Sequence, residues 1–298
     1  MKKIISLTMI VCLIFLSSCS STPNVKSEVS EKLVVYTSFY PLYYLANQIG
    51  KDKIELKIII PNGVEPHDYE PSMKKVQGVE KADIFIYNGA NFEPWSDKLI
   101  ENIGKGKITT VNASQAVELI KNDGVPDPHI WLNPLNMDKI GLEVKNALVL
   151  KDEKNKEFYE NNYLELSKKL HELDQKYETV LKNKKKDIIL VSHSAFSYMA
   201  KRYGLRQVAV AGITPDEEPS PKTMAKLVEL AKEENIKYIF FETLASPKTA
   251  DIVAKEANLK VLTLNPVAGL TKEEQKNGEE YISIMETNLE NLKKALVN

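Results

Sequence analysis

Residues 154–183 read KNKEFYENNYLELSKKLHELDQKYETVLKN, a stretch that contains neither glycine nor proline. Apolar and aromatic residues recur in it at alternating intervals of four and three positions: Tyr159, Tyr163, Leu166, Leu170, Leu173, Tyr177 and Val180. This spacing predicts one long helix with an apolar stripe along one face. At 1.5 Å per residue, such a helix would extend about 45 Å, enough to cross a whole domain.

Apolar runs of strand type flank this helix on both sides. Four precede it, at residues 33–38, 54–60, 84–88 and 108–113, and four follow it, at 188–193, 207–212, 238–243 and 260–265. Such runs, separated by helical stretches, are typical of parallel strands buried on both faces. The predicted fold class is therefore α/β, with two lobes that each contain a mostly parallel four-stranded sheet.

The predicted lobes cover residues 33–150 and 186–298, and the helix joins them as a rigid linker over residues 151–185. The apolar stripe would also suit a coiled-coil partner. Two flanking α/β lobes instead favour packing of the stripe within the chain. A rigid connector of this kind predicts that any closing motion between the lobes is small.

The first residues have the pattern of an export signal. Two lysines precede an apolar stretch from Ile4 to Leu16 that is too short to span a bilayer as a helix. The following LSSC resembles a lipobox, which implies cleavage after residue 18 and lipid attachment at Cys19. An ordinary secretory peptide is the alternative. Residues 19–32 are polar and are predicted to form a flexible tether outside the cell membrane.

Charge and cysteine content exclude some functions. The chain has 40 Lys and Arg against 41 Asp and Glu, and no long basic run, so nucleic-acid binding has no electrostatic support. Cys12 lies in the predicted leader, so the exported chain keeps one thiol and forms no internal disulfide.

Three of the chain's four histidines lie in turns beside predicted strands or helices. His67 lies in VEPHDYEP (64–71), His129 lies in a turn before a helix that Asn133 is predicted to cap, and His193 ends a strand. In open α/β sheets the carboxyl ends of the strands face the ligand crevice. His171, in contrast, lies on the linker helix off the apolar stripe, so we interpret it as a solvated surface residue.

Three converging imidazoles would favour zinc and would leave one tetrahedral position to fill. Spacing alone does not decide between convergence and three separate turn histidines. The chain also lacks the His-Glu-x-x-His pattern of helical zinc proteases.

Five segments in this order resemble the metal-binding lipoproteins of ABC importers, the zinc and manganese receptor family: SFYPLYYLANQIG (38–50), PNGVEPHDYEPS (61–72), DPHIWLNP (127–134), SHSAFSYMAKRYGL (192–205) and GITPDEEPSPKTMAKL (212–227). The resemblance covers essentially the whole chain after the leader. It implies two α/β lobes joined by a rigid helix, with the metal in the cleft between them. It also implies a monomer, lipid-anchored at Cys19, that delivers its ion to an ABC permease and its ATPase.

By the same resemblance, His67 and His129 are metal ligands from the first lobe and His193 is the ligand from the second. Manganese receptors of this family carry a carboxylate at the third position. A histidine there favours Zn²⁺, because imidazole suits zinc while manganese prefers oxygen donors. Mn²⁺ or iron remains the alternative cargo.

The sequence departs from the family at two places. The segment before His129 has no histidine-rich loop, and LNPVAGLT (264–271) has Asn265 and Ala268 where the family has a carboxylate ligand. Asn265 or a water molecule would then complete the metal's coordination, with Glu273 less well placed. Glu242 is interpreted either as a hydrogen-bond partner of a ligand histidine or as an acid at a helix start.

Three other functions remain beside the zinc receptor. The first is a secreted zinc hydrolase with Glu65 or Glu242 as base, against which the sequence has no nucleophile motif. The second is a surface adhesin, a description that some members of the resembled family carry. The third is a manganese or iron receptor. We expect a receptor, not an enzyme.

Overall fold

The computed structural model describes residues 32–103, 107–122, 124–215, 219–246 and 248–298. The predicted leader 1–18 and the lipidation site Cys19 lie outside these residues. Contacts join residues 32–298 into one compact unit. No helix among the described residues combines the length and the apolar character needed to cross a membrane.

A four-stranded parallel sheet forms the centre of the first lobe. Its strands are β1 (Leu33–Thr37), β2 (Ile54–Ile58), β3 (Ile84–Tyr87) and β4 (Thr109–Asn112), in the order β2-β1-β3-β4. Val35 of β1 pairs with Leu56 on one side and Ile84 on the other. All four residues of β3 are buried, as expected for a central strand covered on both faces.

The second lobe repeats this arrangement. Its strands are β7 (Ile188–Val191), β8 (Arg206–Ala209), β9 (Tyr238–Phe241) and β10 (Lys260–Thr263), in the order β10-β9-β7-β8 and all parallel. Counted within its own half, each sheet therefore places its first strand between its second and third. The predicted fold class is confirmed, and all eight predicted runs contain a strand.

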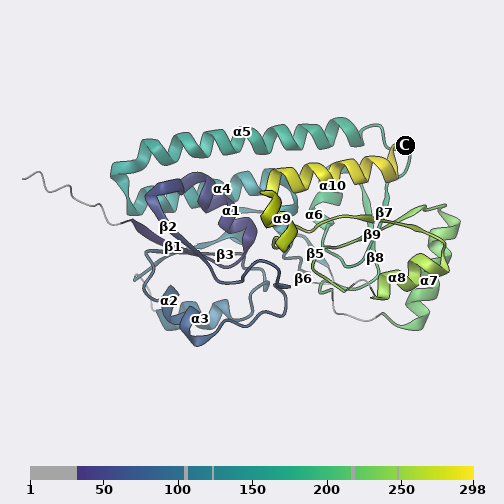
Figure 1. Ribbon diagram of the computed structural model, residues 1–298, viewed down its shortest axis with the longest axis horizontal. Coiled ribbons are helices and arrows are strands. Elements are labelled where there is room, and N and C mark those ends of the chain that lie inside the picture. Colours follow the sequence, from purple (N-terminus) through teal and green to yellow (C-terminus); the bar gives the residue numbers. More distant parts are fainter. Residues whose placement is uncertain (1–31, 104–106, 123, 216–218, 247) are drawn as a thin grey trace, which may run out of the picture. The chain divides into compact units, whose positions relative to one another are not determined.

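Helices surround both sheets (Figure 1). Those of the first lobe are α1 (Tyr40–Gly50), α2 (Met73–Val79), α3 (Ser96–Ile103) and α4 (Pro134–Lys151), and those of the second are α6 (Ser197–Tyr203), α7 (Pro221–Glu233), α8 (Lys248–Glu256), α9 (Lys272–Asn277) and α10 (Tyr281–Leu296). A short hairpin of β5 (Lys121–Asn122) and β6 (Val125–Pro126) precedes His129.

The predicted linker is α5 (Lys156–Leu181), which runs along both lobes (Figure 1). It packs against α1 and α4 of the first lobe and against α6 and α10 of the second. Every position of the predicted stripe is buried or half-buried. The stripe is therefore covered by helices of the same chain, which removes the reason for a coiled-coil partner.

Hydrogen bonds also join the lobes beside the cleft. Trp131, which is fully buried, donates its indole N–H to the carbonyl of Pro266 at 2.7 Å. The Tyr281 hydroxyl of α10 donates to the carbonyl of Trp131 at 2.6 Å. One hydrophobic core extends across both lobes, from Val35 in β1 to Leu296 in α10. Trp131 thus connects the turn of His129 to the second lobe.

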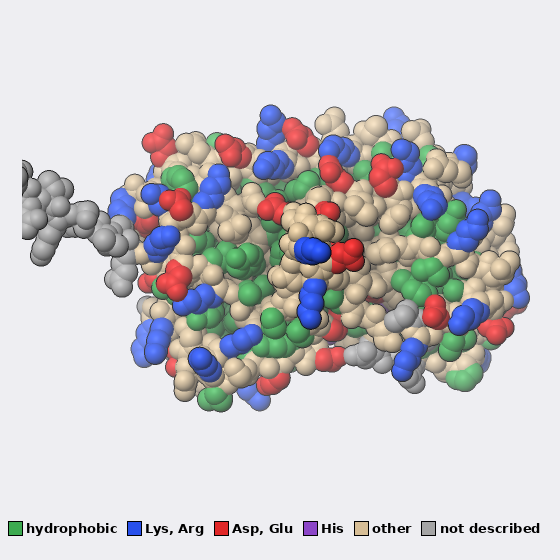
Figure 2. Space-filling view, in the orientation of Figure 1, with side chains coloured by type: hydrophobic (Ala, Val, Ile, Leu, Met, Phe, Trp, Pro, Cys, Tyr) green, Lys and Arg blue, Asp and Glu red, His purple; other side chains and the backbone are tan. Residues whose placement is uncertain are grey.

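The surface carries charges of both signs. Figure 2 shows Lys and Arg interspersed with Asp and Glu on the face it presents, without a large area of one sign. This mixture agrees with the nearly balanced composition of the chain.

Candidate metal centre

His67 lies in the loop between β2 and α2. This loop is fixed locally: the His67 N–H donates to Glu65 Oε1 at 3.3 Å, and the Tyr69 N–H donates to the Pro66 carbonyl at 3.2 Å. The ammonium of Lys75, on α2, donates to the hydroxyl of Tyr69 at 2.8 Å and to the carbonyl of Ile59. The two ends of the loop are thereby tied together, so His67 is presented by a short, constrained backbone.

His129 is oriented by the carboxylate two residues before it. Asp127, which is fully buried, accepts two hydrogen bonds at its Oδ1 atom, from the His129 backbone N–H and from His129 Nδ1, both at 2.9 Å. Donation from Nδ1 leaves the lone pair on Nε2, which faces the Nε2 atoms of His67 and His193. The predicted cap of the next helix is confirmed, since the Asn133 side chain accepts from the Leu135 N–H at 3.0 Å.

His193 follows β7 by two residues. The predicted run 188–193 extends two residues beyond β7, which ends at Val191. The Ser192 N–H still donates to the Phe240 carbonyl of β9 at 3.0 Å. There Glu242 accepts from the hydroxyl of Ser192 and from the His193 backbone N–H at 3.2 Å. Its Oε1 atom lies 2.5 Å from His193 Nδ1, and both side chains are 2% exposed. The two atoms are in close contact without the alignment of a hydrogen bond.

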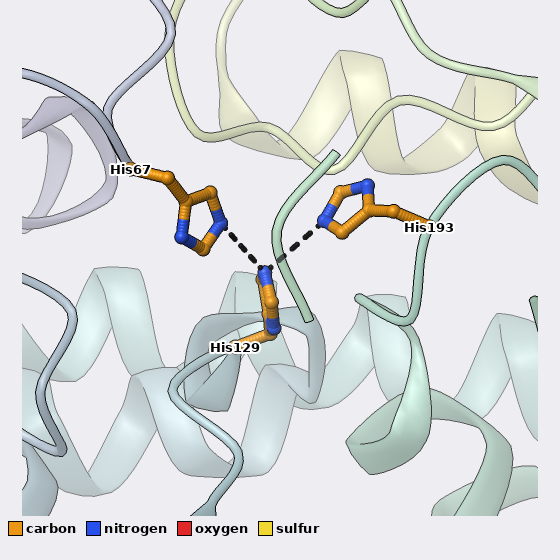
Figure 3. Close-up of side chains that lie close together, drawn as sticks. All are labelled: His67, His129 and His193. Atoms are coloured by element: carbon orange, nitrogen blue, oxygen red, sulfur yellow. Dashed lines mark hydrogen bonds between the residues drawn. The ribbon is translucent and has the colours of Figure 1, made fainter. Parts of the chain in front are cut away.

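The three imidazoles meet at one point between the lobes (Figure 3). His129 Nε2 lies 3.1 Å from His67 Nε2 and 3.3 Å from His193 Nε2. One ligand atom from each ring lies within 4.8 Å of the others, and among the described residues no cysteine or carboxylate joins this group. The three histidines are therefore positioned to bind a metal.

Burial lowers the pKa of two of these rings. Burial, together with the neighbouring His129 and His193, lowers the pKa of His67 to about 2. Burial also lowers the pKa of His129, although the adjacent Asp127 opposes that shift. Neutral imidazole is the form that donates a lone pair to a metal, so the lowered pKa values of His67 and His129 favour binding of a cation over binding of a proton.

The other predicted residues lie around this centre in different ways. Asn265 is buried, and its carboxamide accepts from the Val267 N–H and donates to Glu274, both at 2.7 Å. These bonds use Asn265 within its own loop and against α9, so the structure gives it a local stabilising role. Glu273 is exposed on α9. His171 is exposed on α5 and pairs with Asp138 at 3.1 Å, as expected for a surface residue.

Sequence reasoning missed one contact of the site. The carboxylate of Asp127 accepts from the backbone N–H of His129 and also from its ring. The signal was present in the DPH tripeptide, because an acid two residues before a ligand histidine can reach its ring across a tight turn.

The fold and this centre define a class of protein: a two-lobed α/β solute-binding receptor with a metal site between its lobes. The chain belongs to the family described as zinc-uptake complex component A, periplasmic, whose model matches residues 35–295. This family consists of binding receptors and not of enzymes.

Several relatives of the chain are named for zinc. The high-affinity zinc uptake system protein ZnuA of Bacillus subtilis (strain 168) is 41% identical over 306 residues, which cover 96% of this chain and 95% of that protein. The zinc-binding lipoprotein AdcA of Streptococcus pneumoniae (strain R6) is 37% identical, over 98% of this chain. The chain spans 61% of the length of AdcA.

Solved structures share the fold. The Zn(II)-bound ZnuA-like domain of the pneumococcal AdcA has a TM-score of 0.81 and 39% identity, over 90% of this chain and all of that one. The laminin-binding protein Lmb of Streptococcus agalactiae, described as bifunctional with adhesin and metal-transporting activity, has a TM-score of 0.82 and 30% identity, over 89% and 99%.

Proposed function

We propose that this chain is an extracytoplasmic receptor that captures Zn²⁺ with the Nε2 atoms of His67, His129 and His193. The observation that carries the proposal is the spacing of these atoms, 3.1 and 3.3 Å from the central His129. A tetrahedral zinc with Zn–N bonds of about 2.0–2.1 Å requires its donor atoms to lie about 3.3 Å apart. Both pairs that include His129 already have this separation, and all three donor atoms lie within 4.8 Å of one another.

Two carboxylates contact the ligand rings on the side away from the proposed ion and supply negative charge to the site. Asp127 and Glu242 contact the Nδ1 atoms of His129 and His193, and both side chains are almost fully buried. Together they supply two negative charges against the two positive charges of Zn²⁺, although neither touches the ion. Such outer carboxylates raise the basicity of ligand imidazoles. Because the two carboxylates already balance the charge of Zn²⁺, a neutral solvent molecule suffices as the fourth ligand. We propose solvent as this ligand in place of Asn265.

The donor set favours zinc over manganese. Three imidazoles suit Zn²⁺, whereas Mn²⁺ binds better to oxygen ligands, and no carboxylate of the described residues joins the cluster. A hydrolytic role has less support, because Glu242, one of the two candidate bases, is held against Ser192 and His193. We therefore propose a receptor without catalytic activity.

The family supplies the context for delivery. Its members belong to zinc uptake systems, and relatives are named as lipoproteins. We propose that the chain is anchored by a lipid on Cys19 at the outer face of the cell membrane. From there it passes Zn²⁺, as a monomer, to an ABC permease driven by its ATPase. The proposed domain limits are those predicted from the sequence, with the linker over 151–185.

Elemental analysis and competitive metal titration of the full chain test this function. We expect one zinc per chain, with Mn²⁺ bound much more weakly. His193→Ala should weaken zinc binding by more than the roughly 10–100-fold typical of losing an outer partner. His171→Ala is the matched control, because that ring is exposed and pairs with Asp138. Equal effects of the two substitutions would refute the assignment.

A further inference from the structure

The loop NGANFE (88–93), which follows β3, has an unusual backbone. Gly89, Ala90 and Asn91 adopt positive φ angles of 73°, 51° and 62° in succession. A side chain at Gly89 would have no room, because an added Cβ would lie 2.2 Å from Asn112 Oδ1. Consecutive left-handed residues other than glycine are unfavourable, and they persist where the surrounding structure fixes them, often near functional sites.

A buried carboxylate fixes this loop. Glu93 is 2% exposed, and its two oxygens accept from the backbone N–H groups of Asn88 at 2.8 Å and Gly89 at 3.1 Å. Burial raises the pKa of Glu93 to about 7, while these backbone hydrogen bonds oppose the shift. The Phe92 N–H donates to the Gly89 carbonyl at 3.0 Å and closes the turn. The carboxylate is thus used to hold two consecutive amides at the start of the loop.

The loop contacts the metal centre first through Phe92. This side chain is 1% exposed, and its ring lies 4.9 Å from that of His67 at an interplanar angle of 78°, an edge-to-face contact. Phe92 is itself held by Phe39 at 4.7 Å and Trp131 at 5.0 Å. Carboxylates lie against the rings of the other two ligands. The aromatic cluster packs against the ring of His67 and, through Trp131 at 5.3 Å, also against the ring of His129.

The second contact is made by Asn88. Its side chain is fully buried and donates from Nδ2 to the carbonyl of Pro128 at 2.9 Å. That carbonyl belongs to the peptide that leads directly into His129. One loop therefore contacts the ring of one first-lobe histidine and the backbone of the other, although it supplies no metal ligand.

From these contacts we infer that loop 88–93 positions the first-lobe half of the metal site. Phe92 sets the ring plane of His67, Asn88 sets the peptide before His129, and Glu93 fixes the loop that carries both. The inference rests on the proposed zinc site. It names Phe92, Asn88 and Glu93 as residues that determine affinity and coordination geometry without touching the ion.

The test is Phe92→Leu in the full chain, with Phe85→Leu as its matched control. Both rings are buried in the first lobe, but Phe85 lies on β3 and packs against Tyr87 and Trp95, away from the histidines. We expect Phe92→Leu to raise the zinc Kd about tenfold, at the lower end of the effects of outer partners. The visible spectrum of bound Co²⁺, which reports coordination geometry, should change as well. Phe85→Leu should lower thermal stability and leave both metal readouts unchanged.

Glu93→Gln is the second variant, since it preserves side-chain size and contacts neither histidine ring. A glutamine offers one acceptor oxygen where Glu93 serves two N–H groups, so the loop should loosen and the zinc Kd should rise. The inference is overturned if Phe92→Leu has the Co²⁺ spectrum and the zinc Kd of the unsubstituted chain. It is also overturned if Phe85→Leu changes the spectrum and the Kd as much as Phe92→Leu does. If Phe92→Leu does not fold, unchanged zinc binding by Glu93→Gln overturns it. Failure of the unsubstituted chain to bind zinc or Co²⁺ would instead refute the proposed function itself.

Discussion

The substitution Asp127→Asn measures how much the negative charge beside His129 contributes to zinc affinity. The Asp127 side chain is fully buried, and one oxygen accepts from both the backbone and the ring of His129 at 2.9 Å. An asparagine has nearly the same shape and keeps an acceptor oxygen, so the turn should persist. What it removes is the negative charge that fixes the ring tautomer and raises the basicity of Nε2.

The magnitude follows from the ring hydrogen bond. A hydrogen bond to a charged group contributes about 1.5–3 kcal/mol, and one between neutral groups about 0.5–1.5 kcal/mol. The substitution therefore removes about 1–1.5 kcal/mol from the orientation of His129. Since about 1.4 kcal/mol corresponds to a factor of ten in Kd, we expect zinc affinity to fall about tenfold. Water cannot compensate, because the carboxylate is not exposed.

Competition against a chelator of known zinc affinity, at constant pH and salt, measures this change. Asp138→Asn is the matched control, because Asp138 pairs with the surface residue His171 at 3.1 Å in another aspartate–histidine contact. It should leave the zinc Kd unchanged. The reasoning is refuted if Asp127→Asn binds zinc as tightly as the unsubstituted chain, or if Asp138→Asn weakens binding equally.

Two further predictions concern pH and the contact between the lobes. Burial lowers the pKa of His67 to about 2 in the folded protein, from about 6.5 in the unfolded chain. Between these two pH values the unfolded chain therefore binds more protons than the folded protein. The metal-free protein should lose stability as the pH falls below 6.5. The Tm of the metal-free protein should fall between neutral pH and pH 5, and the slope of Tm against pH should be smaller in His67→Gln. Equal slopes in the two proteins would contradict this prediction. Trp131→Phe leaves the Pro266 carbonyl without its donor, at a cost of about 1–3 kcal/mol, which corresponds to a drop in Tm of roughly 3–10 °C. Trp95→Phe should cost less, because among the described residues its indole N–H has no hydrogen-bond partner, and equal losses would exclude the Pro266 bond as the cause.

The elements of the fold were predictable because their signals are local. The stripe from Tyr159 to Val180 lies wholly within α5, and the eight apolar runs identified the strands of both sheets. The ends were less accurate, as at His193, where the run continued past the strand. There Glu242, from a distant part of the sequence, accepts from the Ser192 hydroxyl and the His193 backbone N–H, and no local pattern encodes these bonds.

The candidate residues of the site were predictable from the sequence, but their positions relative to one another were not. The turns and strand ends identified His67, His129 and His193 as candidates, and the exposed helix face set His171 apart. Whether three rings that are 62 and 64 residues apart in sequence share one ion depends on how the lobes pack. That packing is fixed by α5 and by contacts such as Trp131 with Pro266.

The sequence by itself thus determined the strands, the connecting helix and the candidate metal-binding side chains, since propensity, periodicity and turn chemistry act over a few residues. Only the tertiary structure decided the distances between the rings, the placement of Asp127 and Glu242 behind them, the use of Asn265 within its own loop and the contact of Phe92 with His67. Each of these depends on the relative positions of segments that are brought together by burial of a common core, and a short pattern does not specify those positions.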